Sequence, residues 1–422
     1  MTGRRRRLAA AAGALLALLI PMGLALGAGR AEKVRLGSVL RGAEEIVAYD
    51  RSRALLLVEK EYSASAIARV RADGSLDPSF GSGGILDFPA ADAVVMADGK
   101  ILVASRAASP SDPHDLDARV TRLLADGSVD TSFGRHGSGY VDFGGTYDQA
   151  ATLALAPDGK VIVGGSRSFG VSGRGFSDAQ PAVGRLRPSG AVDRSFGRRG
   201  ARVLSSGAEA GVFAVAAAPR GGVIAVGNGY LGTDVWKLTA AGELDRRFGE
   251  GGLVNVEGRG RRERYGWEEE LTAIEEVGVV RGGKVLLAGM GARYGGDGTR
   301  YRALALRLRP DGGIDRSYGR RGWAMAGFRG WFFANALAVL RGGRLLVAGS
   351  AQVPIGKDSD AGIVAFDANG RLDRRVGNRG RVRIELGGWD SVRGLTARDG
   401  RAVLLGGPDG ERDPWLARIP VR

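Results

Sequence analysis

The chain has 422 residues, a formal net charge of +15 at pH 7 and no cysteine, which excludes disulfide bonds, thiolate metal sites and thiol nucleophiles. Its hydrophobic content of 44 % excludes a disordered chain, and its 71 glycines fit many short strands joined by tight turns. A chain of this length needs several domains or a repeat architecture that spreads the core along it.

The first 31 residues form a targeting segment in our interpretation. Four arginines at positions 4–7 precede an apolar run at positions 8–20, and small residues follow. This order is typical of a secretory signal peptide. An apolar stretch extended to Ala28 also suits an uncleaved N-terminal anchor. We therefore expect a secreted or cell-envelope-associated protein that is exported by this N-terminal signal.

The charge of the remaining chain stays positive. Residues 32–422 carry 56 Lys and Arg against 46 Asp and Glu, a formal net charge of +10. Such a surface favours polyanions, including acidic envelope polymers. The arginines are scattered rather than gathered in one stripe, so decoration of strands and turns is the simpler explanation. No nucleic-acid partner is expected.

Two motifs alternate along residues 34–420. One is a hairpin in which a Gly turn joins two β-rich runs, clearest in Ala154–Gly165. The other runs from an Arg through a Gly turn to an Asp that is followed, three residues later, by an aromatic residue and Gly. It is clearest in Arg69–Gly81. The aspartates of the second motif are Asp77, Asp130, Asp193, Asp245, Asp315 and Asp373.

These motifs resemble the delta-60 repeat family of bacterial β-propeller proteins. The family's repeat couples an apolar-Asp-Gly-Lys-apolar-Gly hairpin to an Arg-Leu-x-x-Asp-Gly-x-Leu-Asp-x-x-Phe-Gly segment. The resemblance covers residues 34–420 and implies a propeller fold, but it implies no particular activity. We expect each repeated Asp to tie a turn and each aromatic ring to pack between blades. A metal-binding or acid–base role is the alternative for these aspartates.

Each period contains four short β-rich runs, and seven hairpins can be counted. We therefore predict an all-β fold: a seven-bladed β-propeller of four-stranded blades at residues 32–422, with the count open by one. Residues 34–36 look like a lone outer strand, and residues 415–419 look like a third strand without a fourth. We expect the N-terminal strand to join the last blade and close the ring, which removes an exposed edge.

Loop lengths vary only in the connections that emerge on one face of such blades, as expected of a binding face. We call this the loop face. It also gathers large aromatic and basic residues, which suit recognition of sugars or peptides. Small cores that cover the strand ends are the alternative explanation. The candidate ligand-binding residues are Tyr265, Trp267, Tyr294, Tyr301, Arg329, Trp331, Phe332, Phe333 and Trp389.

Acidic residues give two weaker hypotheses. Glu275 and Glu276 fall on the innermost strand of the fifth blade, where they either line the channel and bind a cation or mark a bulge. Asp112, Asp115 and Asp117 crowd one loop, but they lack the Asp-x-Asp-x-Asp-Gly spacing of a calcium loop. We regard them as weak calcium candidates and predict neither a metal site nor a cofactor.

The function predicted from these features is that of a non-catalytic binding or scaffold propeller of unidentified ligand. The chain has only His114 and His136, and it lacks a Gly-x-Ser-x-Gly motif, so no catalytic residue is assigned. A carboxylate-dependent glycan-active enzyme and a purely structural envelope component are the alternatives. The expected partner is an extracellular protein, a glycan or an anionic envelope polymer, and we expect a monomer.

Overall fold

The computed structural model describes residues 32–421 except 38–39, 41, 50–51, 60–64, 173–174, 178, 206–210, 230–231, 258–267, 295–299, 353–358, 385–389, 399 and 409–412. The predicted targeting segment, residues 1–31, lies outside the described residues. In the described part of the chain, no helix has the length and hydropathy needed to cross a membrane. The described helical structure includes the short turns η3 (Pro219–Gly221) and η4 (Arg341–Gly343).

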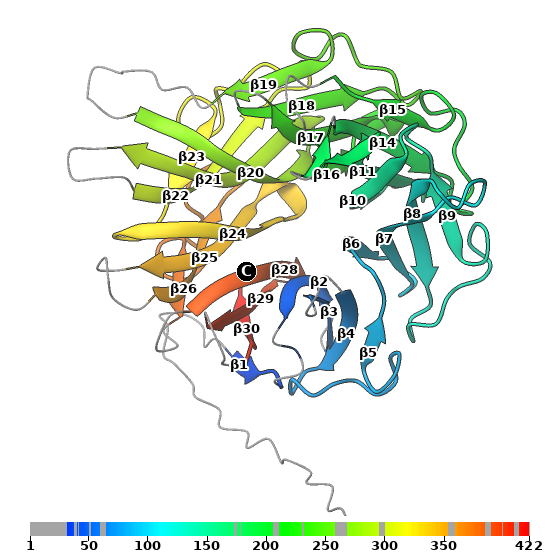
Figure 1. Ribbon diagram of the computed structural model, residues 1–422. Coiled ribbons are helices and arrows are strands. Elements are labelled where there is room, and N and C mark those ends of the chain that lie inside the picture. Colours follow the sequence, from blue (N-terminus) through cyan, green and yellow to red (C-terminus); the bar gives the residue numbers. More distant parts are fainter. Residues whose placement is uncertain are drawn as a thin grey trace, which may run out of the picture.

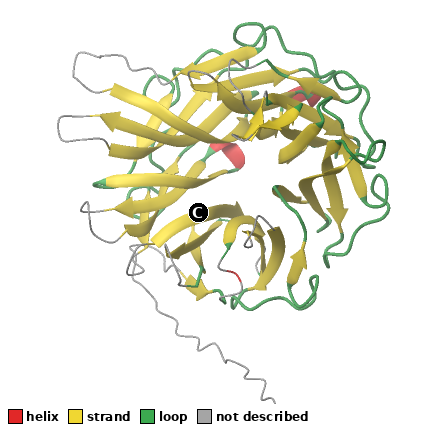
Figure 2. Ribbon diagram, in the orientation of Figure 1, coloured by secondary structure: helices red, strands yellow, loops and turns green. Residues whose placement is uncertain are grey.

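The strands form antiparallel sheets that radiate from a common centre, as in a β-propeller (Figures 1 and 2). The first four-stranded sheet contains β2 (Ala43–Tyr49), β3 (Arg53–Glu59), β4 (Ser65–Arg71) and β5 (Ile85–Asp87). Another contains β16 (Val212–Ala217), β17 (Val223–Gly229), β18 (Gly232–Leu238) and β19 (Leu253–Glu257). The next contains β20 (Glu268–Val280), β21 (Lys284–Tyr294), β22 (Arg300–Leu308) and β23 (Trp323–Ala326). It is followed by β24 (Trp331–Val339), β25 (Leu345–Gln352), β26 (Ser359–Phe366) and β27 (Arg381–Ile384). The last combines β28 (Asp390–Arg398), β29 (Arg401–Pro408) and β30 (Trp415–Pro420) with β1 (Glu32–Arg35).

The prediction of seven separate four-stranded blades is wrong. Among the described residues, five sheets are four-stranded, and the second and third repeats merge into one eight-stranded sheet. The cause is a parallel pairing of Leu116 with Tyr147, which joins the start of β8 to the start of β10. The merged sheet contains β6 (Asp92–Val95), β7 (Ile101–Ala108), β8 (Leu116–Leu123), β9 (Ser138–Val141), β10 (Tyr147–Leu155), β11 (Val161–Ser168), β14 (Gln180–Leu186) and β15 (Ala201–Val203). A separate hairpin, β12 (Gly170–Ser172) and β13 (Gly175–Ser177), follows β11.

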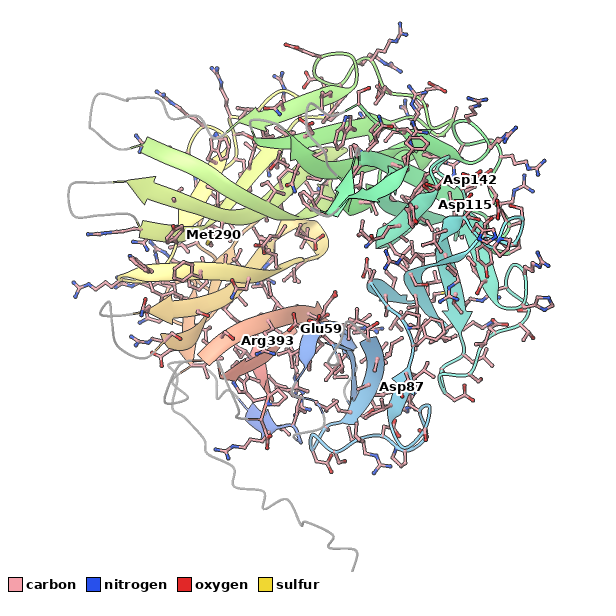
Figure 3. The ribbon with its side chains drawn as sticks, viewed as in Figure 1. Glu59, Asp87, Asp115, Asp142, Met290 and Arg393 are labelled. Atoms are coloured by element: carbon pink, nitrogen blue, oxygen red, sulfur yellow. The ribbon has the colours of Figure 1, made fainter. Side chains whose placement is uncertain are left out.

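The predicted closure of the ring by the N-terminal strand is confirmed. β1 pairs antiparallel with β30, with Val34 opposite Leu416. Val34 and Leu36 are buried, and Leu36 packs in the same core cluster as Leu416. On the inner side of this seam, β28 contacts β2. Arg393 of β28 is labelled in Figure 3, and its guanidinium lies 3.8 Å from a carboxylate oxygen of Glu44. The first and last parts of the chain therefore complete one sheet.

The hydrophobic core lies between neighbouring sheets. One cluster, for example, combines Ala336 and Ile363 of the β24–β27 sheet with Leu404 and Trp415 of the sheet closed by β1. Because both faces of each sheet are covered in this way, the second and third strands are continuous apolar runs rather than alternating ones. β3 illustrates this, since its five central residues are all buried.

The second repeated motif ties each repeat to the next. The Arg185 Nε donates to Asp193 at 2.8 Å, and the guanidinium lies 4.6 Å from the centre of the Phe196 ring. One of its Nη atoms donates to the Gly221 carbonyl of the following repeat at 3.2 Å. Asp193 also accepts the backbone N–H and the hydroxyl of Ser195, which fixes the turn. The predictions that the Asp ties a turn and that the ring packs between repeats are confirmed here.

The same arrangement recurs elsewhere in the ring, which makes these aspartates scaffold residues. The matching ion pairs are Arg69–Asp77, Arg122–Asp130 and Arg307–Asp315, each with an N–O distance of 2.8 Å. Burial raises the pKa of Asp193, but hydrogen bonds from Ser195 and the charge of Arg185 outweigh it, so the pKa is lowered overall. A carboxylate held ionised against an arginine is unsuited to proton transfer.

Candidate functional site on the loop face

Three aromatic rings meet at the loop face, and we call them the aromatic cluster. Tyr301 lies at the start of β22, and Trp331 and Phe333 lie at the start of β24. The ring centres of Tyr301 and Phe333 are 4.8 Å apart, and Trp331 stands edge-on to both at 6.1 and 5.7 Å. All three side chains are half-buried. These rings therefore stabilise one another while part of their surface stays open to solvent.

Strand alternation explains the arrangement. Trp331 and Phe333 are two residues apart and point to one face of β24, whereas Phe332 points to the other. Phe332 is fully buried and contacts Phe328, with ring centres 5.2 Å apart. The structure thus places Phe332 in the core and leaves Trp331 and Phe333 as surface candidates.

Arginines lie near the aromatic cluster in the chain. Arg329 is exposed and lies two residues before Trp331. Arg302 donates one Nη atom to the carbonyls of Tyr301, at 3.0 Å, and Gly330, at 2.6 Å, so it joins the start of β22 to the loop before β24. Rings with an exposed guanidinium group nearby can bind a ligand that has both apolar faces and anionic groups.

The other aromatic candidates cannot be placed in this cluster. Tyr294 ends β21, and its side chain lies outside the described parts of the structure. Tyr265, Trp267 and Trp389 lie outside the described residues. Of the nine predicted ligand-binding residues, the structure therefore brings Tyr301, Trp331 and Phe333 into mutual contact, with Arg329 two residues before Trp331.

A second set of functional candidates lies on the innermost strands. The same position in three inner strands carries an acidic residue, and an apolar residue follows it. These residues are Glu45 of β2, Asp92 of β6 and Glu276 of β20. Glu275 occupies a register shift between Ile274 and Glu276, so the expected bulge is present. Glu45 and Asp92 were not identified as candidates from the sequence, because their inner strands were not aligned with the strand that carries Glu276.

These three inner carboxyl groups interact electrostatically, and each has a pKa above its ordinary value. Glu45 is exposed, but the protein atoms crowded around its carboxyl group, followed by the charges of Asp92 and Glu276, raise its pKa to about 7. Burial raises the pKa of Asp92 to about 6, although hydrogen bonds from backbone N–H groups, including that of Leu153, oppose it. Burial and the charge of Asp92 raise the pKa of Glu276 to about 7. A cluster of this kind can hold a proton or a cationic group near neutral pH.

The inner carboxyl groups make stability depend on pH in a defined direction. Their folded-state pKa values lie above the ordinary value, so the folded state binds more protons, and stability falls as pH rises from about 4.5 to about 7. Replacing Glu276 with Gln should remove the contribution of Glu276 to this pH-dependent change in the free energy of unfolding, on the order of 1–2 kcal/mol. Thermal unfolding of both proteins at pH 5 and pH 8 measures this. A Glu276→Gln variant with the same pH slope as the wild type would contradict it.

An acidic cluster lies at the junction of β8 and β10. Carboxylate oxygens of Asp117, Asp142 and Asp148 all lie within 4.8 Å of one another. Asp115 lies beside Asp142 (Figure 3), and the charge of Asp142 contributes to its raised pKa after the larger effect of burial. Asp112, by contrast, accepts the backbone N–H of His114 and does not belong to the group.

The sequence pointed to part of this acidic cluster. Asp115 and Asp117 were candidates because they crowd one loop, whereas Asp142 and Asp148 belong to the next connection and were missed. The available signal was their place in the chain: one connection precedes β8, and the other precedes β10. Both connections emerge on the loop face, where the starts of these strands pair.

A cavity of about 600 Å³ lies at the end of the β24–β27 sheet that faces away from the loop face. The last copy of the second motif, around Asp373, lines this cavity. In that copy, Ala365 stands in the position of the buried Arg, and Val376 stands in the position of the aromatic residue. Asp373 is held instead by Arg344 at 2.7 Å and Arg375 at 2.8 Å. The cavity is lined by Asp367, Arg371, Leu372, Asp373, Arg374, Arg375, Arg379 and Arg381.

Comparison with known proteins supports a β-propeller repeat family. A family model described as "Domain of unknown function (DUF5122) beta-propeller" matches residues 60–80, 97–133 and 156–196, which is less than half of the chain. A search of curated proteins found no match.

Three solved structures are similar over most of their length. Drosophila Plexin A, solved in complex with Semaphorin 1b, has 10 % identity, a TM-score of 0.45 and coverage of 92 % of this chain and 86 % of its own. The WD40 domain of Toxoplasma gondii coronin has 11 % identity, a TM-score of 0.48 and coverage of 95 % and 89 %. The Nup133 β-propeller domain of Vanderwaltozyma polyspora has 9 % identity, a TM-score of 0.45 and coverage of 94 % and 99 %. At these values the similarity says nothing about function.

Proposed function

We propose that this chain is an exported, non-catalytic recognition module of the delta-60 repeat type, and that its loop face binds a carbohydrate polymer that carries anionic groups. The observation that supports this most directly is the aromatic cluster, in which Tyr301, Trp331 and Phe333 contact one another while remaining partly open to solvent. Rings that served only the core would be buried as Phe332 is.

The chemistry of the surroundings selects the ligand class. Ring faces bind the apolar faces of sugars, and the exposed Arg329 can pair with a carboxylate, sulfate or phosphate group. The net charge of +10 over residues 32–422 attracts such a polymer from a distance. The fixed position of the cluster at the starts of β22 and β24, which belong to neighbouring sheets, keeps the entropic cost of binding low.

The experiment is binding of the purified protein to an array of glycans and anionic polymers, beside a Trp331→Ala/Phe333→Ala variant. We expect the variant to lose at least tenfold in affinity, because it removes two of the three contacting rings. The matched control is Arg371→Ala/Arg374→Ala, which removes two charges at the opposite end of the ring and should bind as the wild type does. Loss of affinity in the arginine variant but not in the ring variant would show diffuse charge attraction and contradict the proposal.

Absence of binding to every glycan and polymer would also contradict the proposal and favour a protein partner. A thermal unfolding curve for the Trp331→Ala/Phe333→Ala variant shows whether it is folded. A Phe332→Ala variant separates the two kinds of ring: it should lose about 3–5 kcal/mol of stability because it empties a fully buried site.

The inner carboxyl groups favour a second candidate function, a glycan-active enzyme. Glu276, with its pKa raised to about 7, has the protonation behaviour of a general acid, and Asp92 acts on it electrostatically. Release of reducing ends from a polymer bound on the array, abolished by Glu276→Gln, would establish this activity. Binding without release supports the recognition module.

A further inference from the structure

We propose that Asp117, Asp142 and Asp148 bind a calcium ion at the junction of β8 and β10, with Asp115 beside them. This inference is independent of the ligand proposed for the aromatic cluster. The first support is geometric. One oxygen of each of the three carboxylates lies within 4.8 Å of the others. Two oxygens on one Ca²⁺ at 2.3–2.6 Å lie at most about 5 Å apart.

The second support is a pair of buried oxygen atoms without partners. Asp117 is 4 % exposed, and its Oδ1 accepts no hydrogen bond; the Oδ1 of Asp115 is likewise buried and without a partner. A buried carboxylate oxygen left in this condition costs free energy, which is why such atoms are usually paired or bound to a metal. A cation bound between these carboxylates removes the cost.

The third support is the charge of the surroundings. In the described part of the chain, no Lys or Arg forms an ion pair with any of these four aspartates. The nearby Arg167 directs one Nη atom to the carbonyls of Phe143 and Gly144, each at 3.4 Å. Among the described residues, the concentrated negative charge therefore has no Lys or Arg as an ion-pair partner.

The site is also fixed in position. The pairing of Leu116 with Tyr147 holds the two strand starts together. The two carboxylate oxygens of Asp148 accept the backbone N–H groups of Phe143, at 2.5 Å, and Gly145, at 3.2 Å, and this orients the carboxylate. Donors made only of oxygen suit hard cations, and carboxylates gathered without an octahedral framework suit Ca²⁺ better than Mg²⁺. The ion would join two repeats at the place where their sheets merge.

The test is calorimetric titration of Ca²⁺ into the EGTA-treated, dialysed full chain, with thermal unfolding in EGTA and in Ca²⁺. We expect one site with a Kd of about 1 mM or tighter and a rise in unfolding temperature on addition of Ca²⁺. Asp142→Asn should weaken Ca²⁺ binding at least tenfold. It should also raise the unfolding temperature in EGTA, because it removes charge repulsion. Since Asp142 is exposed, this variant should fold.

The matched control is Asp112→Asn, which changes an exposed aspartate in the same loop but outside the cluster. It should bind Ca²⁺ within twofold of the wild type. Three results would overturn the proposal: neither heat nor a temperature shift with Ca²⁺, equal weakening by Asp112→Asn and Asp142→Asn, or binding of Mg²⁺ at least as tight as that of Ca²⁺.

Discussion

Asp193→Ala should lower the free energy of unfolding by about 3–5 kcal/mol. The substitution leaves the Arg185 guanidinium buried, at 6 % side-chain exposure, without its carboxylate partner. It also removes the acceptor of the Ser195 hydroxyl and backbone N–H, so the turn that holds Phe196 loses its tie. Because Arg185 also reaches the next repeat at Gly221, the damage should spread across two sheets.

Chemical denaturation followed by tryptophan fluorescence measures this loss. The control is Asp158→Ala, which breaks a solvent-exposed ion pair with Lys160 in a hairpin turn. It should change stability by no more than about 0.5 kcal/mol. A double variant, Arg185→Met/Asp193→Leu, should recover part of the loss, because no buried charge is left alone. Equal effects of Asp193→Ala and Asp158→Ala would contradict the role given to the buried pair.

Loss of the N-terminal strand should have the second large effect. A variant whose chain begins at residue 37 lacks Val34 and Leu36, both buried against the last sheet. We expect it to lose about 4 kcal/mol or more, as for the removal of two large apolar side chains. It also exposes the backbone edge of β30, so it should self-associate more strongly than the wild type does.

Unfolding temperature and light scattering measure both consequences. A synthetic peptide of residues 31–40, added in excess, should restore part of the stability by pairing with β30. Arg35→Ala is the control, because this side chain is exposed and the backbone pairing with Trp415 does not depend on it. A truncated protein that is as stable as the wild type and self-associates no more than it does would show that the ring does not need its N-terminal strand.

The repeated chemistry made most of the fold predictable from the sequence. The Asp-Gly turns give the hairpins, because Asp accepts a backbone N–H two residues on, as Asp158 does from Lys160. The incomplete sheets at the two ends of the chain predicted the pairing of β1 with β30. The merged sheet could not be predicted, because it depends on one long-range pairing, Leu116 with Tyr147, between loops of irregular length.

The candidate sites were less predictable, for the same reason. Strand alternation alone could have separated Phe332 from Trp331 and Phe333. The contact of Tyr301 with Trp331, however, joins different sheets, and the repeat pattern does not determine it. To predict the inner carboxyl groups, the inner strands of different repeats would have to be aligned with one another. To predict the acidic cluster, one would have to know that the connections before β8 and β10 lie side by side. Residues that act within one repeat were found, whereas those that meet across repeats were found only in part.

The most direct test of the recognition proposal is hydrogen–deuterium exchange of the protein with and without the polymer that it binds best on the array. We expect slower exchange at residues 300–304 and 328–335, which carry the aromatic cluster and its arginines, and unchanged exchange at the hairpin turn of residues 157–160, at the opposite end of the ring. Protection of that turn, or of neither region while the polymer is bound, would contradict recognition through the loop face.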